Sequence, residues 1–203
     1  YSSLISYHLL ATLEETVLGL LLGILLGMLI ALSMCLFRPI HAFLLPLLLA
    51  SQALPIFVIA PLLVLWFGYG ITVKILTMSF MMLFPVANNF LDGLKQTPEN
   101  YLNLAHIMNS SRWQTLYQIR IPAALPNLAS GIRIATAMAP LGAIIGEWVG
   151  SSQGLGLLNA NAQMQTGLMF AILAVIFFFS IFIYFLIDKL LCLGMPWTLL
   201  KSH

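Results

Sequence analysis

The chain has 203 residues, of which 61% are hydrophobic and 7% are charged, whereas ordinary soluble domains carry about 25% charged residues. A soluble protein of this size cannot bury so much apolar surface, so the composition excludes a soluble domain and indicates an integral membrane protein. The net charge is +2 and there is no basic run, so nothing in the sequence points to nucleic acid as a partner.

The first long apolar run covers 17–37 and carries no charged residue, which predicts a membrane-spanning helix. Three glycines recur within it at every fourth position, namely Gly19, Gly23 and Gly27. Small residues at this spacing let a second helix approach closely, so we expect these glycines to form a packing face.

The second run, 42–67, contains three prolines, and an interior proline removes a backbone hydrogen bond and bends its helix. We therefore expect this span to be kinked or broken. Freed carbonyls are tolerated in lipid only against protein or a water-filled cavity, which places Gln52 and Pro55 near the protein interior. They either line a translocation pathway or form a structural kink that Gln52 satisfies.

The third run, 71–90, has Lys74 near its start, where the side chain can snorkel to the membrane surface. Asn88 and Asn89 lie near the other end of the run. Asparagines in a membrane either line a pathway or hydrogen-bond to neighbouring groups. We assign the structural role to Asn88 and keep Asn89 as a candidate pathway residue.

The longest polar interruption follows, from Thr97 to Pro126, and predicts two short helices joined by a tight break outside the bilayer. Thr97 is a suitable N-cap, and Asn109 can adopt the left-handed conformation that ends a helix. Ser111 with Gln114 has the pattern of a capping box, which would start the second helix. Pro122 should stop that helix.

The first helix of this hairpin carries an apolar stripe at helical spacing, made of Tyr101, Leu104, Ala105 and Met108. Three interpretations fit such a stripe. It packs on the chain's own helices, it lies on the membrane surface, or it docks on a soluble partner. Residue chemistry alone does not choose between packing and docking.

The fourth and fifth runs cover 128–149 and 168–187. Glu147, near the outer end of the fourth run, is either a solvated acid at a helix end or a residue that faces a cavity or a partner. Arg133, inside the same run, is expected to reach the cytoplasmic interface or a neighbouring carboxylate.

Five spans place the hairpin and the C-terminus on the same side of the membrane. Lys74 alone lies near the opposite side. By the positive-inside rule the hairpin side is therefore cytoplasmic. The cations on that side are Arg38, Lys95, Arg112, Arg120, Lys189 and Lys201.

The sequence contains no recognisable catalytic set. Its four histidines are scattered without the spacing of metal ligands, and no glycine-rich loop carries the lysine of a nucleotide site. Cys35 and Cys192 are too few and too far apart for a metal or disulfide framework. We therefore expect no metal, no cofactor and no enzyme activity on this chain.

The hairpin resembles the signature loop of permeases of type I ATP-binding-cassette importers, which reads Glu-Ala-Ala, three residues, Gly, nine residues, then Ile-x-Leu-Pro. Asn103 stands here in place of the Glu and Asn109 in place of the Gly. Asn accepts a positive φ more readily than most residues, so the turn should be retained. The resemblance extends from about Leu9 to Lys189. The corresponding segments are Asn103-Leu104-Ala105, Asn109 and Ile119-Arg120-Ile121-Pro122, all at matching spacing.

Two further stretches, 60–70 and 146–156, resemble the branch of these importers that carries sulfonates, taurine, nitrate and the pyrimidine precursor of thiamine. Within that branch the likeness is greatest to permeases for the thiamine pyrimidine precursor. The resemblance implies a small polar solute, either that precursor or a sulfonate-like or nitrate-like anion.

The resemblance also implies a fold and partners. The fold would be the all-α, five-span fold of the methionine-importer permease, as one domain over 1–203 in the bacterial inner membrane. Two copies would form a homodimer with the pathway between them. Two cytoplasmic ATP-binding-cassette subunits would use ATP and Mg²⁺ and would bind the hairpin of each copy, residues 97–122, as a coupling helix. An extracytoplasmic binding protein would deliver the solute, and alternating access would move it across.

Under this resemblance the hairpin residues form a contact with the ATPase. The apolar centre would be Tyr101, Leu104, Ala105, Met108 and Trp113, with Asn109 at the turn and Glu99, His106 and Arg112 at the rim. Candidate pathway residues are Gln52, Pro55, Asn89 and Glu147. The alternative is a self-sufficient channel or secondary transporter, which predicts grouped mid-membrane charges and inverted repeats, and the sequence shows neither.

Overall fold

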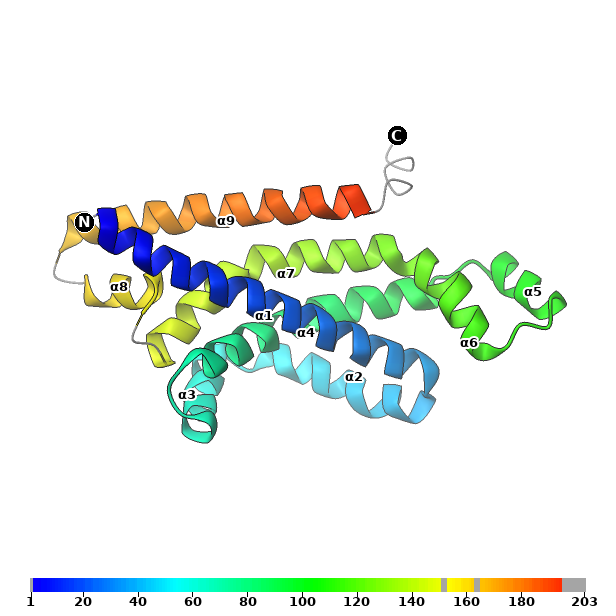
Figure 1. Ribbon diagram of the computed structural model, residues 1–203. Coiled ribbons are helices and arrows are strands. Elements are labelled where there is room, and N and C mark those ends of the chain that lie inside the picture. The colour runs from blue at the N-terminus through cyan, green and yellow to red at the C-terminus, as the bar shows by residue number, and fades with distance from the viewer. Residues whose placement is uncertain (1, 151–152, 163–164, 195–203) are drawn as a thin grey trace.

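The computed structural model describes residues 2–150, 153–162 and 165–194, and every regular element among them is a helix. This confirms the predicted all-α fold. Figure 1 shows long helices running lengthwise, with the hairpin beyond the end where α9 finishes, and α8 beside the start of α1 at the opposite end. The elements are α1 (Ser2–Leu36), α2 (Arg38–Ala53), α3 (Ile56–Phe67), α4 (Ile71–Lys95), α5 (Glu99–Ile107), α6 (Arg112–Thr115), the π-helical turn η1 (Leu116–Arg120), α7 (Ile121–Gly150), α8 (Leu155–Asn161) and α9 (Thr166–Gly194).

Among the described residues, four stretches of helix are long and apolar enough to cross a membrane, and the bent pair α2 with α3 makes a fifth if it is one span. The first reaches further back than the predicted 17–37, because α1 already begins at Ser2. Glu14 and Glu15 therefore lie within a helix and not before it. The four single stretches are Ile5–Leu36, Ile71–Lys95, Arg112–Val149 and Thr166–Gly194.

The second span is broken, as its prolines predicted. The chain is extended at Leu54 and Pro55, and α2 and α3 meet there at 107°. Pro46 and Pro61 instead lie inside their helices. The expectation that Gln52 and Pro55 lie in the protein interior was wrong for the single chain, because both residues are exposed.

Helix α4 forms the centre of the fold, and glycines of the two neighbouring helices let it pack closely on both sides. A Cβ added at Gly19 of α1 would lie 2.7 Å from the Cβ of Met78. On the other side, a Cβ added at Gly131 of α7 would lie 2.7 Å from the carbonyl oxygen of Pro85. Gly23 and Gly27 face α4 in the same way as Gly19, so the small-residue spacing of α1 is used for helix packing.

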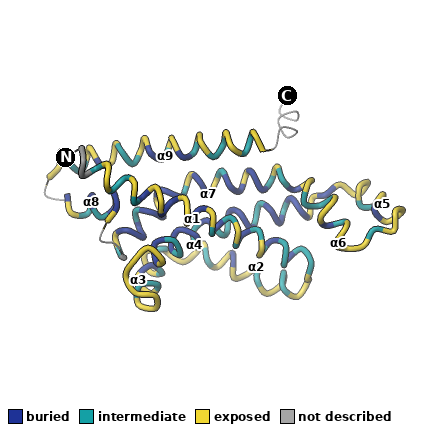
Figure 2. Tube along the Cα trace, viewed as in Figure 1, coloured by how far each residue is buried: buried dark blue, intermediate teal, exposed yellow. Residues whose placement is uncertain are grey.

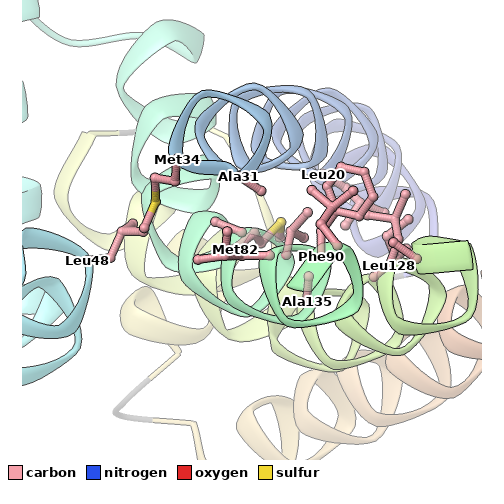
Figure 3. Packing of buried hydrophobic residues seen from close by; sticks show 14 of the residues in the cluster. Leu20, Ala31, Met34, Leu48, Met82, Phe90, Leu128 and Ala135 are labelled. Atoms are coloured by element: carbon pink, nitrogen blue, oxygen red, sulfur yellow. The ribbon is translucent and has the colours of Figure 1, made fainter. Parts of the chain in front are cut away.

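The apolar core lies along the contact of α1, α4 and α7. Figure 3 shows side chains of these helices gathered between them, among them Leu20, Met82 and Ala135. Figure 2 shows buried residues concentrated on α4 and α7, whereas α9 is largely exposed. Exposed apolar helix faces are expected where a chain meets lipid or another membrane subunit.

Replacing Gly131 with Ala should destabilise the chain by about 1 to 3 kcal/mol, because the new methyl group meets backbone and not a flexible side chain. Thermal unfolding of the purified protein in detergent would measure the change. Gly167→Ala is the matched control, since a Cβ there has no atom within 4 Å. Equal unfolding temperatures for the two variants would contradict the close packing of α4 and α7.

Candidate functional site

The turn between the two hairpin helices depends on Asn109, which is the one non-glycine residue with positive φ in the described part of the chain, at 52°. Two hydrogen bonds close the end of α5: the N–H of Asn109 donates to the carbonyl of His106 at 3.1 Å, and the N–H of Ser110 donates to that of Ala105 at 3.0 Å. This pair of bonds is a Schellman motif. The predicted left-handed turn is present.

The second hairpin helix starts with the capping box that the sequence indicated. The N–H of Gln114 donates to the Ser111 hydroxyl, and the N–H of Ser111 donates to the Gln114 side-chain oxygen at 2.8 Å. Two donors at the helix start are thereby satisfied. The first helix starts differently from expectation, because the Thr97 hydroxyl donates back to the carbonyl of Leu94 and Pro98 takes the N-cap position.

Pro122 does not stop the second helix, contrary to expectation. The π-helical turn η1 lies directly before it, and α7 then continues to Gly150. A proline lacks an N–H and crowds the carbonyl four residues earlier. The wider π turn leads into the proline without interrupting the helical path. The hairpin is therefore joined to the membrane by continuous helix from Arg112 to Val149.

The hairpin presents a cluster of exposed apolar side chains at the end of the helical bundle. Leu104 is 52% exposed and Ile107 is 81% exposed. Sequence reasoning missed Ile107 and Tyr117, although their apolar character next to the stripe could have indicated them. The exposed apolar surface of the hairpin, here called the hairpin face, consists of Tyr101, Leu104, Ile107, Met108, Trp113 and Tyr117.

Ala105 is not on the hairpin face, because it is only 3% exposed and packs inward. With His106 and Arg112 it lines a pocket against the junction of α1 and α2. Glu99 is exposed at the first turn of α5, where a negative charge is favourable at the helix start. The predicted stripe is therefore divided between an outward face and a buried edge.

At the opposite end of the molecule, Glu147 is fully buried and belongs to a polar cluster. The hydroxyl of Thr12 donates to its Oε1 at 2.6 Å, and the N–H of Gly156 donates to its Oε2 at 2.5 Å. The same hydroxyl of Thr12 accepts from the N–H of Leu155 at 3.0 Å. Interpreting Glu147 as a solvated helix-end acid was therefore wrong, and in this conformation its carboxylate faces α1 and the start of α8.

Gly154 lets the chain pass close to this carboxylate. Its φ is +124°, and an added Cβ would lie 2.1 Å from the Cδ of Glu147. Its N–H donates to Nδ1 of His8 at 2.9 Å. Residues of α1, α7 and the segment before α8 are thus held together by buried hydrogen bonds, which are costly to break inside a protein.

Lys74 of α4 belongs to the same end and forms a buried ion pair with Glu15 of α1. Both side chains are almost inaccessible to solvent, so Lys74 does not snorkel to the surface as expected. The burial has a structural cause, since Gly146 of α7 leaves the backbone of Lys74 in close contact. The ion pair therefore ties α1 to α4 beside the Glu147 cluster.

Three other polar residues of the spans bond either within their own helix or to a neighbouring helix. The Nδ2 of Asn89 donates to the carbonyl of Pro85 at 2.8 Å, and that of Asn88 donates to Asp92 at 3.2 Å. Arg133 donates to Asp188 of α9 at 2.6 Å, which fulfils the expectation of a neighbouring carboxylate. Among the residues that the structure describes, no group of three or more His, Cys, Asp or Glu side chains is placed to hold a metal ion.

Comparison with known proteins places these features in a family context. The model of the family described as binding-protein-dependent transport system inner membrane component matches residues 23–192. A probable ABC transporter permease protein of Haemophilus influenzae is 51% identical over 94% of this chain and 79% of its own length. The formylaminopyrimidine transport permease protein ThiX of Halalkalibacterium halodurans is 36% identical over 80% of this chain and 65% of its own length.

Two further similarities concern another transported solute and the fold. The riboflavin transport system permease protein RibX of Chloroflexus aurantiacus is 38% identical over 97% of this chain and 74% of its own length. Among solved structures, an inward-facing form of the MetNI methionine ABC transporter has a TM-score of 0.80 at 18% identity, covering 94% of this chain and 95% of that chain. This likeness confirms the predicted methionine-importer-permease-like fold.

The buried ion pair generates a prediction for a single and a double variant. Lys74→Met should destabilise the chain by about 3 to 5 kcal/mol, because it leaves the carboxylate of Glu15 buried without its partner. Adding Glu15→Leu should recover most of the loss. Thermal unfolding in detergent would measure both variants, with exposed Glu14→Leu as the control. A double variant as unstable as Lys74→Met would show that the pair is not the source of the stability.

Proposed function

This chain belongs to the family of binding-protein-dependent transport system inner membrane components, and we propose that it is the permease subunit of an ABC importer that is coupled to its ATPase through the hairpin face. Its relatives are permeases of ABC transporters, in which the ATPase is a separate subunit. The extracytoplasmic partner is a binding protein that delivers the solute.

The observation that carries this proposal is the hairpin face itself. Large apolar side chains are exposed on a segment that lies beyond the end of α9 (Figure 1). Contiguous exposed apolar patches with a polar rim mark interaction sites. Glu99, His106 and Arg112 are exposed on the same hairpin and would supply such a rim, and the excess of cations on that side supports a cytoplasmic location for it.

The helical connection of the hairpin gives it a means to transmit movement. Helices α6 and α7 are joined through η1 into one stretch from Arg112 to Val149. A displacement at the hairpin would therefore be carried along continuous helix to the polar cluster around Glu147. Binding and release of ATP by the partner would shift the spans between inward-open and outward-open arrangements in this way.

The pathway lies between two copies of the chain in this proposal. The break between α2 and α3 leaves irregular backbone at the surface of the single chain, with Gln52 and Pro55 exposed. Irregular backbone at membrane depth is tolerated only against protein or a water-filled cavity. A homodimer that brings two such breaks together would supply both the neighbouring protein and the water-filled cavity. Gln52 and Pro55 therefore remain pathway candidates ahead of Asn89 and Glu147.

For the solute, we propose a small heterocycle that contains a pyrimidine ring. The formylaminopyrimidine and riboflavin permeases are 36% and 38% identical to this chain, and the rings of both solutes include a pyrimidine. The sulfonate and taurine permeases are less similar, at 31% and 29%. These identities favour the heterocycle over the sulfonate-like or nitrate-like anion that the sequence also allowed.

Introducing a charge into the hairpin face should uncouple transport from ATP hydrolysis. Leu104→Asp and Ile107→Asp are each expected to weaken binding of the ATPase by about tenfold or more, because each puts an acid into a contact that must exclude water. Affinity for the purified ATPase, stimulated ATP turnover and solute uptake into liposomes would be measured together. Ala105 is unsuitable for this test because it is buried.

Gln96→Glu is the matched control, since it adds the same charge at an exposed position directly before the hairpin. It should leave affinity and turnover unchanged. Normal coupling in both Asp variants would overturn the docking assignment. Uptake of solute by the purified chain without any ATPase would instead establish a channel or secondary transporter.

A further inference from the structure

A pocket with a volume of about 810 Å³ lies between the hairpin and the junction of α1 and α2. One wall is formed by the end of α1 and the start of α2, from Cys35 to Pro39, and the other by α5, α6 and η1. This volume is within the range of small-molecule sites.

The pocket is strongly cationic. Arg38, Arg112 and Arg120 line it together with His106, and its lining includes no Asp or Glu. Within the described part of the chain the ion pairs are those of Lys74 and Arg133, so none of the three arginines is neutralised by a carboxylate. Guanidinium groups gathered without an acid favour an anionic ligand, and their planar shape matches the oxygens of a phosphate.

One of these arginines is held in place by the pocket wall. The Nη1 of Arg120 donates to the sulfur of Cys35 at 3.5 Å, and the residue is half-buried. The contact links η1 to the end of α1. Arg120 is therefore directed toward the end of α1, and Arg38 at the start of α2 lines the same pocket.

We propose that this pocket binds a phosphate-bearing anion, held by Arg38, Arg112 and Arg120. Two sources supply that chemistry: the headgroup of an anionic phospholipid, and free phosphate or a phosphorylated metabolite. The apolar part of the lining, Leu36, Phe37 and Leu102, favours the lipid, because it offers a surface for the glycerol and upper acyl chain beside the charged groups. Basic pockets between helices on the cytoplasmic side are sites for such headgroups.

The chemistry of the pocket follows from its lining, but its access to lipid of the cytoplasmic leaflet rests on the orientation in the proposed function. Bound phospholipid would connect the hairpin to the α1–α2 junction. The anionic lipid content of the membrane would then influence how firmly the hairpin is held, separately from any contact that the ATPase makes with the hairpin face.

The experiment measures lipid retention by the full chain, purified without its ATPase, using native mass spectrometry. Wild-type protein should retain phosphatidylglycerol in preference to phosphatidylcholine. Arg38→Gln and Arg120→Gln should each lower that occupancy by about fivefold, the ratio that corresponds to about 1 kcal/mol per cation at a membrane surface. Lys189→Gln is the control, because it removes an exposed cation of α9 outside the pocket.

A second arm supplies inorganic phosphate to lipid-depleted protein and follows thermal unfolding. Stabilisation by phosphate that requires Arg38 and Arg120, without a preference for phosphatidylglycerol, identifies the free anion as the ligand. Arg38→Lys and Arg120→Lys keep the charge and should retain most of the binding, which separates loss of charge from misfolding. The proposal is overturned if wild-type protein prefers neither probe, or if Lys189→Gln lowers binding as much as the arginine variants. Because no ATPase is present, neither result depends on docking of the hairpin face.

Discussion

The close approach of α4 to its two neighbours is the constraint on which the rest of the structure depends. Glycines of α1 and α7 meet α4 where a methyl group would collide with a side chain or with backbone. In a membrane there is little hydrophobic driving force between helices, so such contacts must hold the bundle by van der Waals packing. The same three helices carry both functional ends of the molecule, because the hairpin connects α4 to α7 and the buried ion pair connects α4 to α1.

The two ends of the molecule differ in whether their polar groups are buried and paired. At the end with Glu147, carboxylate, hydroxyl and backbone donors are buried and paired, and Gly154 has the backbone conformation that lets the chain close over them. At the hairpin end, the polar groups are caps that stiffen two short helices, and the large apolar side chains remain uncovered. A paired, buried end is suited to holding the helices in register, whereas a stiff segment with uncovered apolar surface is suited to receiving a partner.

Much of this could be predicted from local sequence. The apolar runs predicted the helical membrane fold, and the prolines predicted the broken second span. Ser111, Gln114 and Asn109 predicted the two ends of the hairpin turn. The predictions that were wrong concerned residues whose surroundings depend on contacts between distant segments. The sequence pattern of Lys74 indicated a surface cation, but the residue is paired with Glu15 of α1. The pattern of Ala105 indicated an exposed apolar face, but the residue is buried at the edge of a pocket. The prediction that Pro122 ends the second helix was wrong for a different reason. The π turn before it shifts the backbone hydrogen bonding, so that the N–H of Ile121 donates to the carbonyl of Leu116.

The central claim is that the hairpin face is the contact with a separate ATPase. Hydrogen exchange of the chain in lipid nanodiscs, with and without its ATPase, tests it most directly. We predict that backbone amides of 99–118 become protected when the ATPase binds, while those of α8 at the opposite end keep their exchange rates. Binding of the ATPase with unchanged exchange throughout 99–118 would contradict the assignment and place the contact elsewhere on the chain.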